Sequence, residues 1–329
     1  MEQGEPLVEI WRGDLLESLH CGHVVICGPD GQIEEAWGSP DQLIFPRSSS
    51  KMIQGLPLVM SGAAHAAGLG PKQLAIACAS HQGAALHRET VTTWLGQLGL
   101  GDEALRCGPQ APSDLAERDR LILAGDAPCQ SHNNCSGKHT GFLTLTQHLR
   151  AGPEYAEVDH PVQKEVRAAF EEATGAESPT WAIDGCSAPN FATTVHGLAR
   201  AMARYATAHT RQDSMSKAMV ALREAMQAHP ELVAGETRAC TELMRACPAV
   251  AMKTGAEGVF AAMVPGSGLG IALKITDGTT RAAEAVMTGL LVRAGLLEAA
   301  HPAAEKRLGA IRNWRGLVTG RVQVPAALA

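Results

Sequence analysis

The distribution of apolar residues along the chain changes character between its ends and its middle. Near both ends the apolar residues form short runs, rich in Val, Ile and Leu and separated by Gly, Pro and Asp, which favour strands. In the middle they recur at helical spacing, as at Val91, Trp94, Leu95 and Leu98. We therefore predict strands over 7–11, 22–27, 32–37, 250–253, 258–264 and 269–276.

Helices are predicted for most of the central region and for one long segment near the end. One begins near Ser48, where Ser and Arg precede an apolar run. The others are predicted over 88–98, 141–149, 161–173, 191–206, 214–228, 236–247 and 280–299. Hairpin turns are predicted at Gly28-Pro29-Asp30-Gly31, at Pro265-Gly266-Ser267-Gly268 and at Asp277-Gly278.

Strands at both ends with helices between them predict an α/β (α+β) fold. One antiparallel sheet would be built from both termini, a helical lobe would pack on it, and the active site would lie between them. We expect a single catalytic domain over 1–329. Its sheet subregion would cover about 1–45 and 250–325, and its helical subregion about 46–249.

Composition narrows the possible functions. Of the 329 residues, 45% are hydrophobic but only 4% aromatic, so the core must be aliphatic. The net charge is −6 and no basic stripe occurs, which argues against nucleic acid or an anionic membrane as a partner. The start lacks a signal-peptide pattern, no apolar stretch is long enough to span a bilayer, and the nine cysteines suit a reducing compartment. We therefore expect a cytoplasmic protein.

Ser48 and Lys51 form the first chemical signal. A spacing of three places them on one face of a helix, where a neutral lysine can serve as the base for a serine nucleophile. The lysine pKa must fall far from about 10.4, which burial beside a second cation such as Lys253 would achieve. Alone, a Ser-x-x-Lys sequence is more often a polar helix start with a solvated lysine.

Two further motifs strengthen this interpretation. Lys253-Thr254-Gly255 lies among predicted strands, and Ser131-x-Asn133 lies between it and Ser48. Ser-x-x-Lys, Ser-x-Asn and Lys-Thr-Gly occur in this order in serine β-lactamases and penicillin-binding proteins. The order predicts a fold of that kind.

The densest polar segment runs from Ser131 to His139, and Asp184-Gly185-Cys186 is a second one. A zinc site is one interpretation, with thiolates from Cys135 and Cys186, and with His132, His139 and Asp184 as candidates for a third ligand or an outer partner. A cysteine nucleophile at Cys135 is a rival. Two loops with capping residues and incidental cysteines are the plain structural alternative.

Taken together, these motifs resemble the Rhizobium-etli-type (class 3) L-asparaginases, over about residues 6–300. The segments that carry the resemblance are Pro46-Arg47-Ser48-Ser49-Ser50-Lys51, Ala79-Ser80-His81-Gln82-Gly83, His132-Asn133-Asn134-Cys135-Ser136-Gly137-Lys138-His139, Asp184-Gly185-Cys186 and Lys253-Thr254-Gly255-Ala256-Glu257-Gly258. The resemblance implies a serine β-lactamase-like fold and a homodimer. It also implies L-asparagine as substrate, hydrolysed to L-aspartate and ammonia.

The resemblance also assigns roles to residues. It implies two Ser-Lys tandems, Ser48 with Lys51 and Ser80 with Lys253. The motif order alone offers Ser131 in place of Ser80, and Lys274 on a neighbouring predicted strand is a rival to Lys253. Zinc would be held by Cys135, Lys138 and Cys186, with Asp184 near a zinc-bound water.

The expected mechanism follows from these assignments. Ser48 attacks the carboxamide, Lys51 takes its proton, and backbone N–H groups stabilise the oxyanion. Arg47 is a candidate to bind the substrate α-carboxylate, or it is a surface arginine. His139 contacts substrate or supports the zinc ligands, and Asn133 is a third candidate for substrate contact. The alternatives are a glutaminase or another small-amide amidase on the same fold, and a zinc-binding homologue without activity.

Overall fold

A computed structural model describes residues 3–328, which divide into two compact units. The first, which we call the sheet unit, comprises residues 1–49, 193–206 and 242–329. The second, the helical unit, comprises residues 50–192 and 207–241. The boundary falls between Ser49 and Ser50, inside the predicted Ser-x-x-Lys turn.

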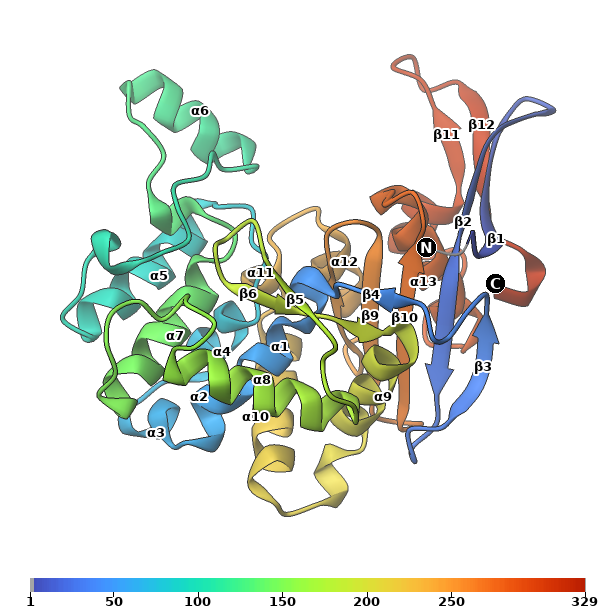
Figure 1. Cartoon of the computed structure of the whole chain (residues 1–329). Helices are drawn as coiled ribbons and strands as arrows, with labels where there is room; N and C mark the ends of the chain where they lie inside the picture. The colour runs from blue at the N-terminus through green and yellow to red at the C-terminus, as the bar shows by residue number, and fades with distance from the viewer. Residues whose placement is uncertain (1–2, 329) are drawn as a thin grey trace. The chain divides into compact units, whose positions relative to one another are not determined.

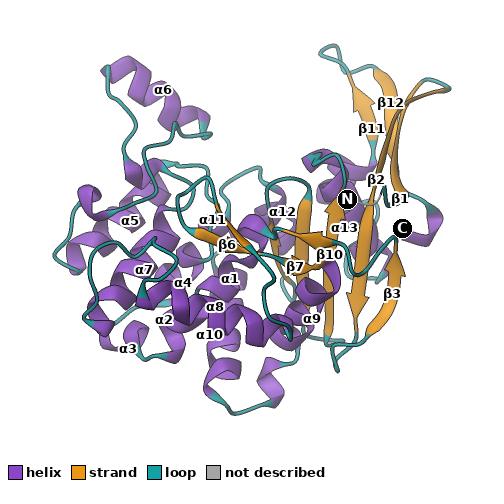
Figure 2. Ribbon diagram, in the orientation of Figure 1, coloured by secondary structure: helices purple, strands orange, loops and turns teal. Residues whose placement is uncertain are grey.

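The sheet unit is built on one antiparallel sheet with the strand order β11-β12-β1-β2-β10-β9-β8, and β3 pairs with β2 (Figure 1, Figure 2). The strands are β1 (Glu5–Arg12), β2 (Leu15–Cys27), β3 (Ile33–Trp37), β8 (Ala251–Thr254), β9 (Val259–Val264), β10 (Leu269–Ile275), β11 (Ala310–Arg312) and β12 (Val318–Gln323). Strands from both termini therefore share the sheet, with Glu9 opposite Gln323 and Cys27 opposite Gly270. The predicted sheet built from both termini is confirmed.

Two helices pack on this sheet, α9 (Val195–Ala206) and α13 (Thr280–Arg293). Gly270 on β10 lets α9 approach closely, because a Cβ atom there would collide with the backbone of Ala199 and Ala203. β9 is buried along its whole length, so the core of this unit lies between the central strands and these helices. The unit also contains β4 (Leu43–Ile44), β7 (Thr193–Thr194), η1 (Arg47–Ser50), α12 (Ala239–Ala246, shared at the boundary), α14 (Pro302–Leu308) and η5 (Ala326–Leu328).

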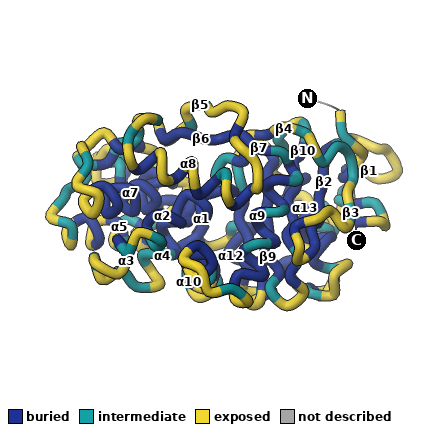
Figure 3. The backbone as a smooth tube through the Cα atoms, turned by 60° about the horizontal axis from the view of Figure 1, so that its bottom comes forward, coloured by how far each residue is buried: buried dark blue, intermediate teal, exposed yellow. Residues whose placement is uncertain are grey.

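The helical unit contains most of the helices. They are α1 (Lys51–Gln54), α2 (Leu56–Met60), α3 (Ala63–Ala66), α4 (Pro71–Ala77), α5 (Ala85–Gln97), α6 (Leu115–Ala124), α7 (Ser136–Leu149), α8 (Pro161–Thr174), α10 (Ser214–Ala228) and α11 (Pro230–Val233). The short elements are η2 (Asp102–Ala104), η3 (Gln130–His132), η4 (Ala208–Thr210) and the hairpin of β5 (Trp181–Ile183) with β6 (Pro189–Phe191). Helix α7 is the most enclosed, since residues 136–146 are all buried (Figure 3).

Several predicted boundaries are wrong for identifiable reasons. The segment 191–206 begins as strand, and helix α9 starts only after Thr194, whose Oγ1 accepts the N–H of Gly197. The segment 236–247 becomes helical at Ala239, because Gly235 and Thr237 have positive φ values of 107° and 65°. Asp277-Gly278 leads from β10 into α13 and is no hairpin turn.

The helix predicted over 141–149 begins five residues earlier, at Ser136. Asn133 prepares this start, because its backbone carbonyl accepts the N–H of Ser136 and its Oδ1 accepts the N–H of Cys135. The polar residues Ser136 to His139 are thus the first turn of a buried helix and no loop. Among the described residues, no helix has the length and apolar character needed to cross a bilayer.

Candidate functional site

The Ser-x-x-Lys segment is a tight turn of helix. Arg47 has a φ of 53°, a left-handed conformation that is unusual for a non-glycine residue, and η1 then runs into α1 without a break. Ser49 donates its hydroxyl to the Pro46 carbonyl at 2.7 Å, which fixes the turn from within. Ser48 is half-buried, whereas Ser49 is buried.

In the sheet unit, the edge strand β8 lies beside this turn. A Cβ atom on Gly255 would come within 2.6 Å of the Pro46 carbonyl oxygen and 3.2 Å of the Ser49 nitrogen, so glycine permits the approach. Lys253 is fully buried and donates to the Thr254 carbonyl at 2.9 Å. The Lys-Thr-Gly motif and the segment that carries Ser48 are therefore neighbours within one unit.

Lys274, the rival of Lys253, occupies β10. It is 6% exposed and its Nζ donates to the Glu257 carbonyl. Burial lowers the pKa of Lys274, Glu257 and Asp277 oppose the decrease, and Arg47 adds a smaller lowering contribution. Arg47 therefore lies close enough to Lys274 for their charges to interact.

Lys51 is the most constrained group of the predicted site. Only 1% of it is exposed, and its Nζ lies 2.5 Å from the Ala79 carbonyl oxygen, 2.9 Å from Ser80 Oγ and 3.5 Å from the Asn134 carbonyl oxygen. All of these contacts lie within the helical unit. The structure thus brings Lys51 onto Ser80, whereas the family resemblance paired Ser80 with Lys253.

The loop after α4 holds Ser80 in this position. The Ser80 N–H donates to the Val233 carbonyl, and the His81 N–H donates to the Asn134 carbonyl that also faces Lys51. The rival Ser131 lies elsewhere: its Oγ is 3.1 Å from Cys129 Sγ. Of these two serines, Ser80 is therefore the one that contacts the Lys51 amine.

The predicted zinc ligands converge in the helical unit. Helix α7 supplies Lys138, whose Nζ lies 3.1 Å from Cys186 Sγ at the tip of the β5–β6 hairpin. Cys135, which precedes α7, has its Sγ 2.9 Å from Asn134 Oδ1, and its thiol also interacts with Cys186. All three residues are at most 4% exposed. Asp184 is half-buried on the same hairpin, and its charge helps to raise the pKa of Lys138.

Helix α7 reaches this position through a close approach to α4. A Cβ atom on Gly137 would collide with the backbone carbonyl of Ile76, so only glycine fits there. The neighbouring Lys138 is thereby fixed against the hairpin that carries Cys186. Its ammonium also lies 5.5 Å from the centre of the Phe142 ring.

His139 supports the sulfur cluster through a chain of hydrogen bonds. Arg106 N–H donates to the Tyr155 hydroxyl at 2.7 Å, and that hydroxyl lies 2.9 Å from His139 Nδ1. Cys186 also interacts with the His139 ring. Burial lowers the pKa of His139, which keeps the ring neutral.

The electrostatics of the cluster follow from these contacts. The hydrogen bond from Cys135 and the charge of Lys138 lower the pKa of Cys186 in spite of burial. The same hydrogen bond and burial raise the pKa of Cys135. Burial alone would lower the pKa of Lys138, but Cys186 and Cys135 raise it on balance. These shifts favour a Cys186 thiolate and a Lys138 ammonium, whose sulfur and nitrogen atoms lie 3.1 Å apart.

These residues also fit a soft metal ion. Two thiols and an amine converge in a buried place, which is a donor set that zinc accepts once the groups lose their protons. His139 supplies the kind of outer partner that such sites use. Among the described residues, no group of three or more His, Cys, Asp and Glu side chains forms a metal site, so this set depends on the lysine. The candidate ligand His132 instead contacts Glu117 and Cys129.

The Lys51 pair and the sulfur cluster adjoin one another. The charge of Lys51 contributes to lowering the pKa of both Cys135 and His139. Asn134 O, a partner of Lys51, belongs to the residue immediately before Cys135. A change in the protonation of Lys51 would therefore change the pKa values of Cys135 and His139.

Asn133, a candidate for substrate contact, has another task in the structure. Its amide nitrogen donates to the Cys107 and Gly108 carbonyls at 2.9 and 3.0 Å. Its role toward substrate stays a prediction. Sequence analysis assigned no role to Tyr155 or to His81, whose Nε2 lies 3.0 Å from Ser136 Oγ. Tyr155 lies in no motif, and His81 lies in the motif segment 79–83, but the partners of both residues are distant in sequence.

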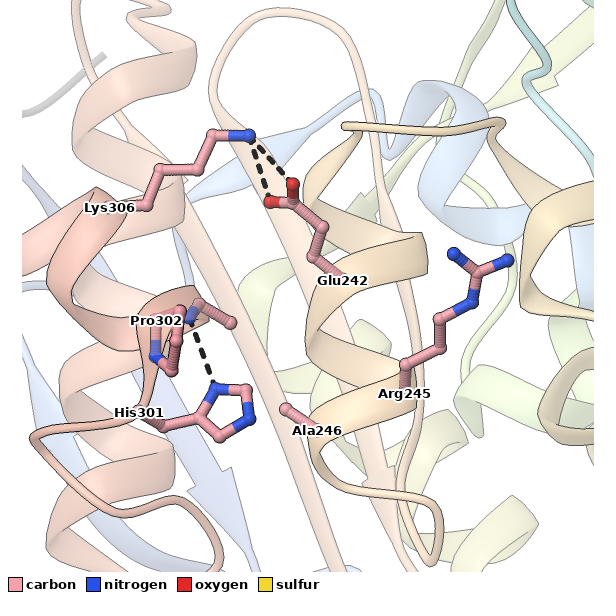
Figure 4. Close-up of a pocket in the computed structure, with 7 residues that line it drawn as sticks. Glu242, Arg245, Ala246, His301, Pro302 and Lys306 are labelled. Carbon is pink, nitrogen blue, oxygen red and sulfur yellow. Dashed lines mark hydrogen bonds and ion pairs between the residues drawn. The ribbon is translucent and has the colours of Figure 1, made fainter.

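A cavity of about 370 Å³ lies elsewhere in the sheet unit (Figure 4). Its lining residues are Glu242, Arg245, Ala246, His301, Pro302, Ala303 and Lys306. None of the predicted site residues lines it. Two of its lining residues, Lys306 and Glu242, form an ion pair at 2.8 Å.

An antiparallel sheet with a Lys-Thr-Gly edge strand and a helical unit that begins at a Ser-x-x-Lys turn define the serine β-lactamase-like class of folds. Residues 8–324 match the sequence profile of L-asparaginase II, so the chain belongs to the L-asparaginase II family. A comparison with curated protein sequences finds no match.

Solved structures similar to this chain include a protein designated Mglu, a Bacillus glutaminase and a β-lactamase from Mycobacterium bovis. The match to native Mglu has 13% identity and a TM-score of 0.48, and covers 85% of this chain and 66% of Mglu. The Bacillus glutaminase match has 13% identity, a TM-score of 0.44 and coverages of 84% and 92%. The β-lactamase match has 12% identity, a TM-score of 0.42 and coverages of 84% and 95%. This chain thus spans slightly less than two thirds of the Mglu chain.

Proposed function

We propose that the chain is an L-asparaginase that hydrolyses L-asparagine to L-aspartate and ammonia through an acyl-enzyme on Ser48. The observation that carries the proposal is the position of Lys51, buried and hydrogen-bonded to Ser80 Oγ three residues after Ser48. Family membership supplies the reaction class. The closer assignment to the Rhizobium-etli type rests on the motifs, above all Cys135-Ser136-Gly137-Lys138-His139.

The three contacts of Lys51 suit a group that gains and loses a proton. A neutral amine has two N–H donors and one lone pair, which match the Ala79 and Asn134 carbonyls and a hydroxyl donated by Ser80. An ammonium has three donors, and the same three oxygens accept them once the Ser80 hydroxyl rotates. Both states are satisfied without rearrangement of the backbone, so proton transfer costs little reorganisation.

The proposed reaction proceeds in two halves. Ser48 Oγ attacks the carboxamide carbon while Lys51 takes the hydroxyl proton. That proton then passes to the amide nitrogen, which leaves as ammonia when the acyl ester forms. Water then attacks the ester, Lys51 again takes a proton, and aspartate departs as Ser48 is restored. Ser80 passes the proton to and from Lys51, and we propose Lys253 as the second cation of the site.

Arg47 is our candidate for the substrate α-carboxylate. Its guanidinium can accept a carboxylate in bidentate fashion, and its left-handed backbone holds it immediately before Ser48. A strained residue at this position is expected where a precise geometry is needed at the nucleophile. Shortening Arg47 to lysine should therefore raise KM more than it lowers kcat.

We also propose that Cys135, Lys138 and Cys186 hold zinc, with Asp184 nearby. The ion would supply a fixed positive charge and cross-link helix α7 to the β5–β6 hairpin. His139 would be an outer partner of the ligand Cys186, with its ring held by Tyr155 at Nδ1. The residues of this cluster position Asn134, whose carbonyl faces Lys51.

Ammonia release tests the proposal directly. Wild type, Ser48→Ala and Ser61→Ala would be assayed with L-asparagine and with L-glutamine. Ser61 is a suitable control because its hydroxyl makes local contacts with backbone, donating to the Pro57 carbonyl and accepting the Ala63 N–H. We expect the wild type to release ammonia from asparagine. The rate should fall by about 10³-fold or more in Ser48→Ala and should stay unchanged in Ser61→Ala. Faster turnover of glutamine would make the chain a glutaminase, and full activity of Ser48→Ala would remove the nucleophile.

A further inference from the structure

Outside the site described above, three side chains of the helical unit form a line. Cys129 Sγ lies 3.1 Å from His132 Nδ1, and His132 Nε2 lies 3.1 Å from Glu117 Oε1. Thiol, imidazole and carboxylate thus follow one another at hydrogen-bond distance. The mechanism proposed for amide hydrolysis uses none of them.

The order of the groups fixes the tautomer of the ring. Hydrogen bonds from Arg120 lower the pKa of Glu117, so its carboxylate is ionised and accepts the Nε2–H of His132. His132 Nδ1 therefore directs its lone pair toward Cys129, where it accepts the backbone N–H and faces the sulfur, each at 3.1 Å. A base oriented by a buried carboxylate, which is 4% exposed here, is the arrangement that activates a thiol.

The sulfur has a second polar neighbour and is reachable from solvent. Ser131 Oγ lies 3.1 Å from Cys129 Sγ, so a hydroxyl and an imidazole face the sulfur together. All nine cysteines fall within residues 3–328, and only Cys21 and Cys129 among them are not buried. Ser131 and His132 are 1% and 3% exposed, which holds both partners in place.

Charges of both signs surround this line. Arg120 and Arg88 lie beside the Glu117 carboxylate at 3.0 and 3.7 Å. Asp102 accepts the backbone N–H groups of Gln130 and Ser131 at 3.0 and 2.7 Å. The aspartate is thereby bonded to the backbone of η3, and the imidazole and the hydroxyl are the groups that meet the sulfur.

We propose that Cys129 is a nucleophilic thiol that reacts with hydroperoxides, with His132 as its base and Glu117 as the residue that positions the base. His132 takes the thiol proton, and the thiolate attacks one oxygen of the peroxide. An S–O bond forms as the O–O bond breaks, and the leaving oxygen takes the proton from His132, giving water from hydrogen peroxide or an alcohol from an organic hydroperoxide. The sulfur is oxidised by two electrons to a sulfenic acid, and the peroxide is reduced.

The position of Cys129 gives this modification a consequence. Cys129 precedes η3, and the chain continues directly into Asn133 and Asn134, whose carbonyl faces Lys51. An added oxygen between Ser131 and His132 must displace one of them, and Ser131 O is an acceptor for Ser136 at the start of α7. Oxidation should therefore slow amide hydrolysis, an expectation that rests on the proposed function.

The test measures the chemistry of the sulfur itself. Wild type, Glu117→Gln and His132→Gln would be exposed to hydrogen peroxide with dimedone, and labelled cysteines would be located by peptide mass analysis. Cys21 is the internal control, as the other cysteine that is not buried. We expect Cys129 to label about tenfold or more faster than Cys21, because an ordinary thiol is only a few per cent thiolate at neutral pH.

The variants separate activation from mere structure. Glu117→Gln should reduce Cys129 labelling about tenfold or more, because an amide N–H allows the ring to adopt the other tautomer. Thermal unfolding of the same samples reports any structural cost. Equal labelling of Cys129 and Cys21, or full labelling in Glu117→Gln and His132→Gln, would overturn the proposal and leave His132 as the cap of η3. Loss of labelling with unchanged ammonia release would uphold the thiol even if amide hydrolysis is not coupled to it.

Discussion

The Nζ atom of Lys51 lies 2.9 Å from Ser80 Oγ. Substitution of Ser80 by alanine leaves the amine with the Ala79 and Asn134 carbonyls and no group that can return a proton. We expect kcat for ammonia release to fall by about 10²-fold or more with little change in KM. Ser131→Ala is the matched control, since Ser131 meets Cys129 and no lysine. Equal losses in both variants would contradict the assignment of Ser80.

Replacement of Lys51 separates its chemistry from its packing. Methionine has a similar length, and as an apolar side chain it removes the free-energy cost of keeping an amine buried away from water. We expect Lys51→Met to lose about 10²- to 10⁴-fold in kcat while unfolding at an equal or higher temperature. A variant that loses both activity and stability would indicate that the amine has a structural role.

Gly137 and Gly141 lie one turn apart on α7 and differ in what an added methyl group would meet. At Gly137 it meets the Ile76 backbone, which cannot move aside, and at Gly141 the nearest atom is a Leu58 methyl group at 3.3 Å. Gly137→Ala should destabilise the fold by about 1–3 kcal/mol. Gly141→Ala should be close to neutral, because the gain in helix propensity offsets the contact. Denaturant unfolding of both variants tests the difference.

Metal analysis of purified protein tests the zinc proposal. Cys135→Ala and Cys186→Ala should each lose the ion, because each removes one of two thiolates. Cys247→Ala is the control, a buried thiol that contacts the Leu296 carbonyl and no other predicted ligand. Zinc retained in Cys186→Ala, or absent from wild type purified without chelators, would refute the site.

His87 predicts how stability depends on pH. Burial lowers the pKa of His87 from its ordinary value of 6.5, although its Nε2–H donates to the Glu231 carbonyl. The unfolded chain therefore binds a proton more readily than the folded one as the pH falls below about 6.5. Stability should decrease there by at most about 1.4 kcal/mol per pH unit from this group, down to its folded pKa. His87→Gln should have a correspondingly shallower decrease in urea unfolding between pH 7 and 5.

The sheet built from both termini was predictable because its strands are apolar and bounded by clear turns. The hairpin of β11 and β12 was not, since its exposed positions carry Arg312, Arg321 and Trp314 and give no apolar pattern. The start of α7 was not predicted from the sequence for a related reason. Ser136, Lys138 and His139 are polar yet buried, because their partners come from other segments.

For the candidate site, sequence could name groups but not pair them. The Ser48–Lys51 spacing is local and readable, whereas the contact of Lys51 with Ser80 depends on how α1 and the loop after α4 pack. The same holds for Lys138 and Cys186, which lie 48 positions apart. Cys129 and His132 are close in sequence, but nothing local indicates that Glu117 completes their line.

The register that sets Cys27 opposite Gly270 also governs how the protein can be made. A ribosome adds about 5–20 residues per second, so β2 emerges ten seconds or more before the strand that will cover it. During that time an apolar strand edge is open to other nascent chains. Expression of this protein should therefore depend on holdase chaperones, and slower translation should increase its aggregation.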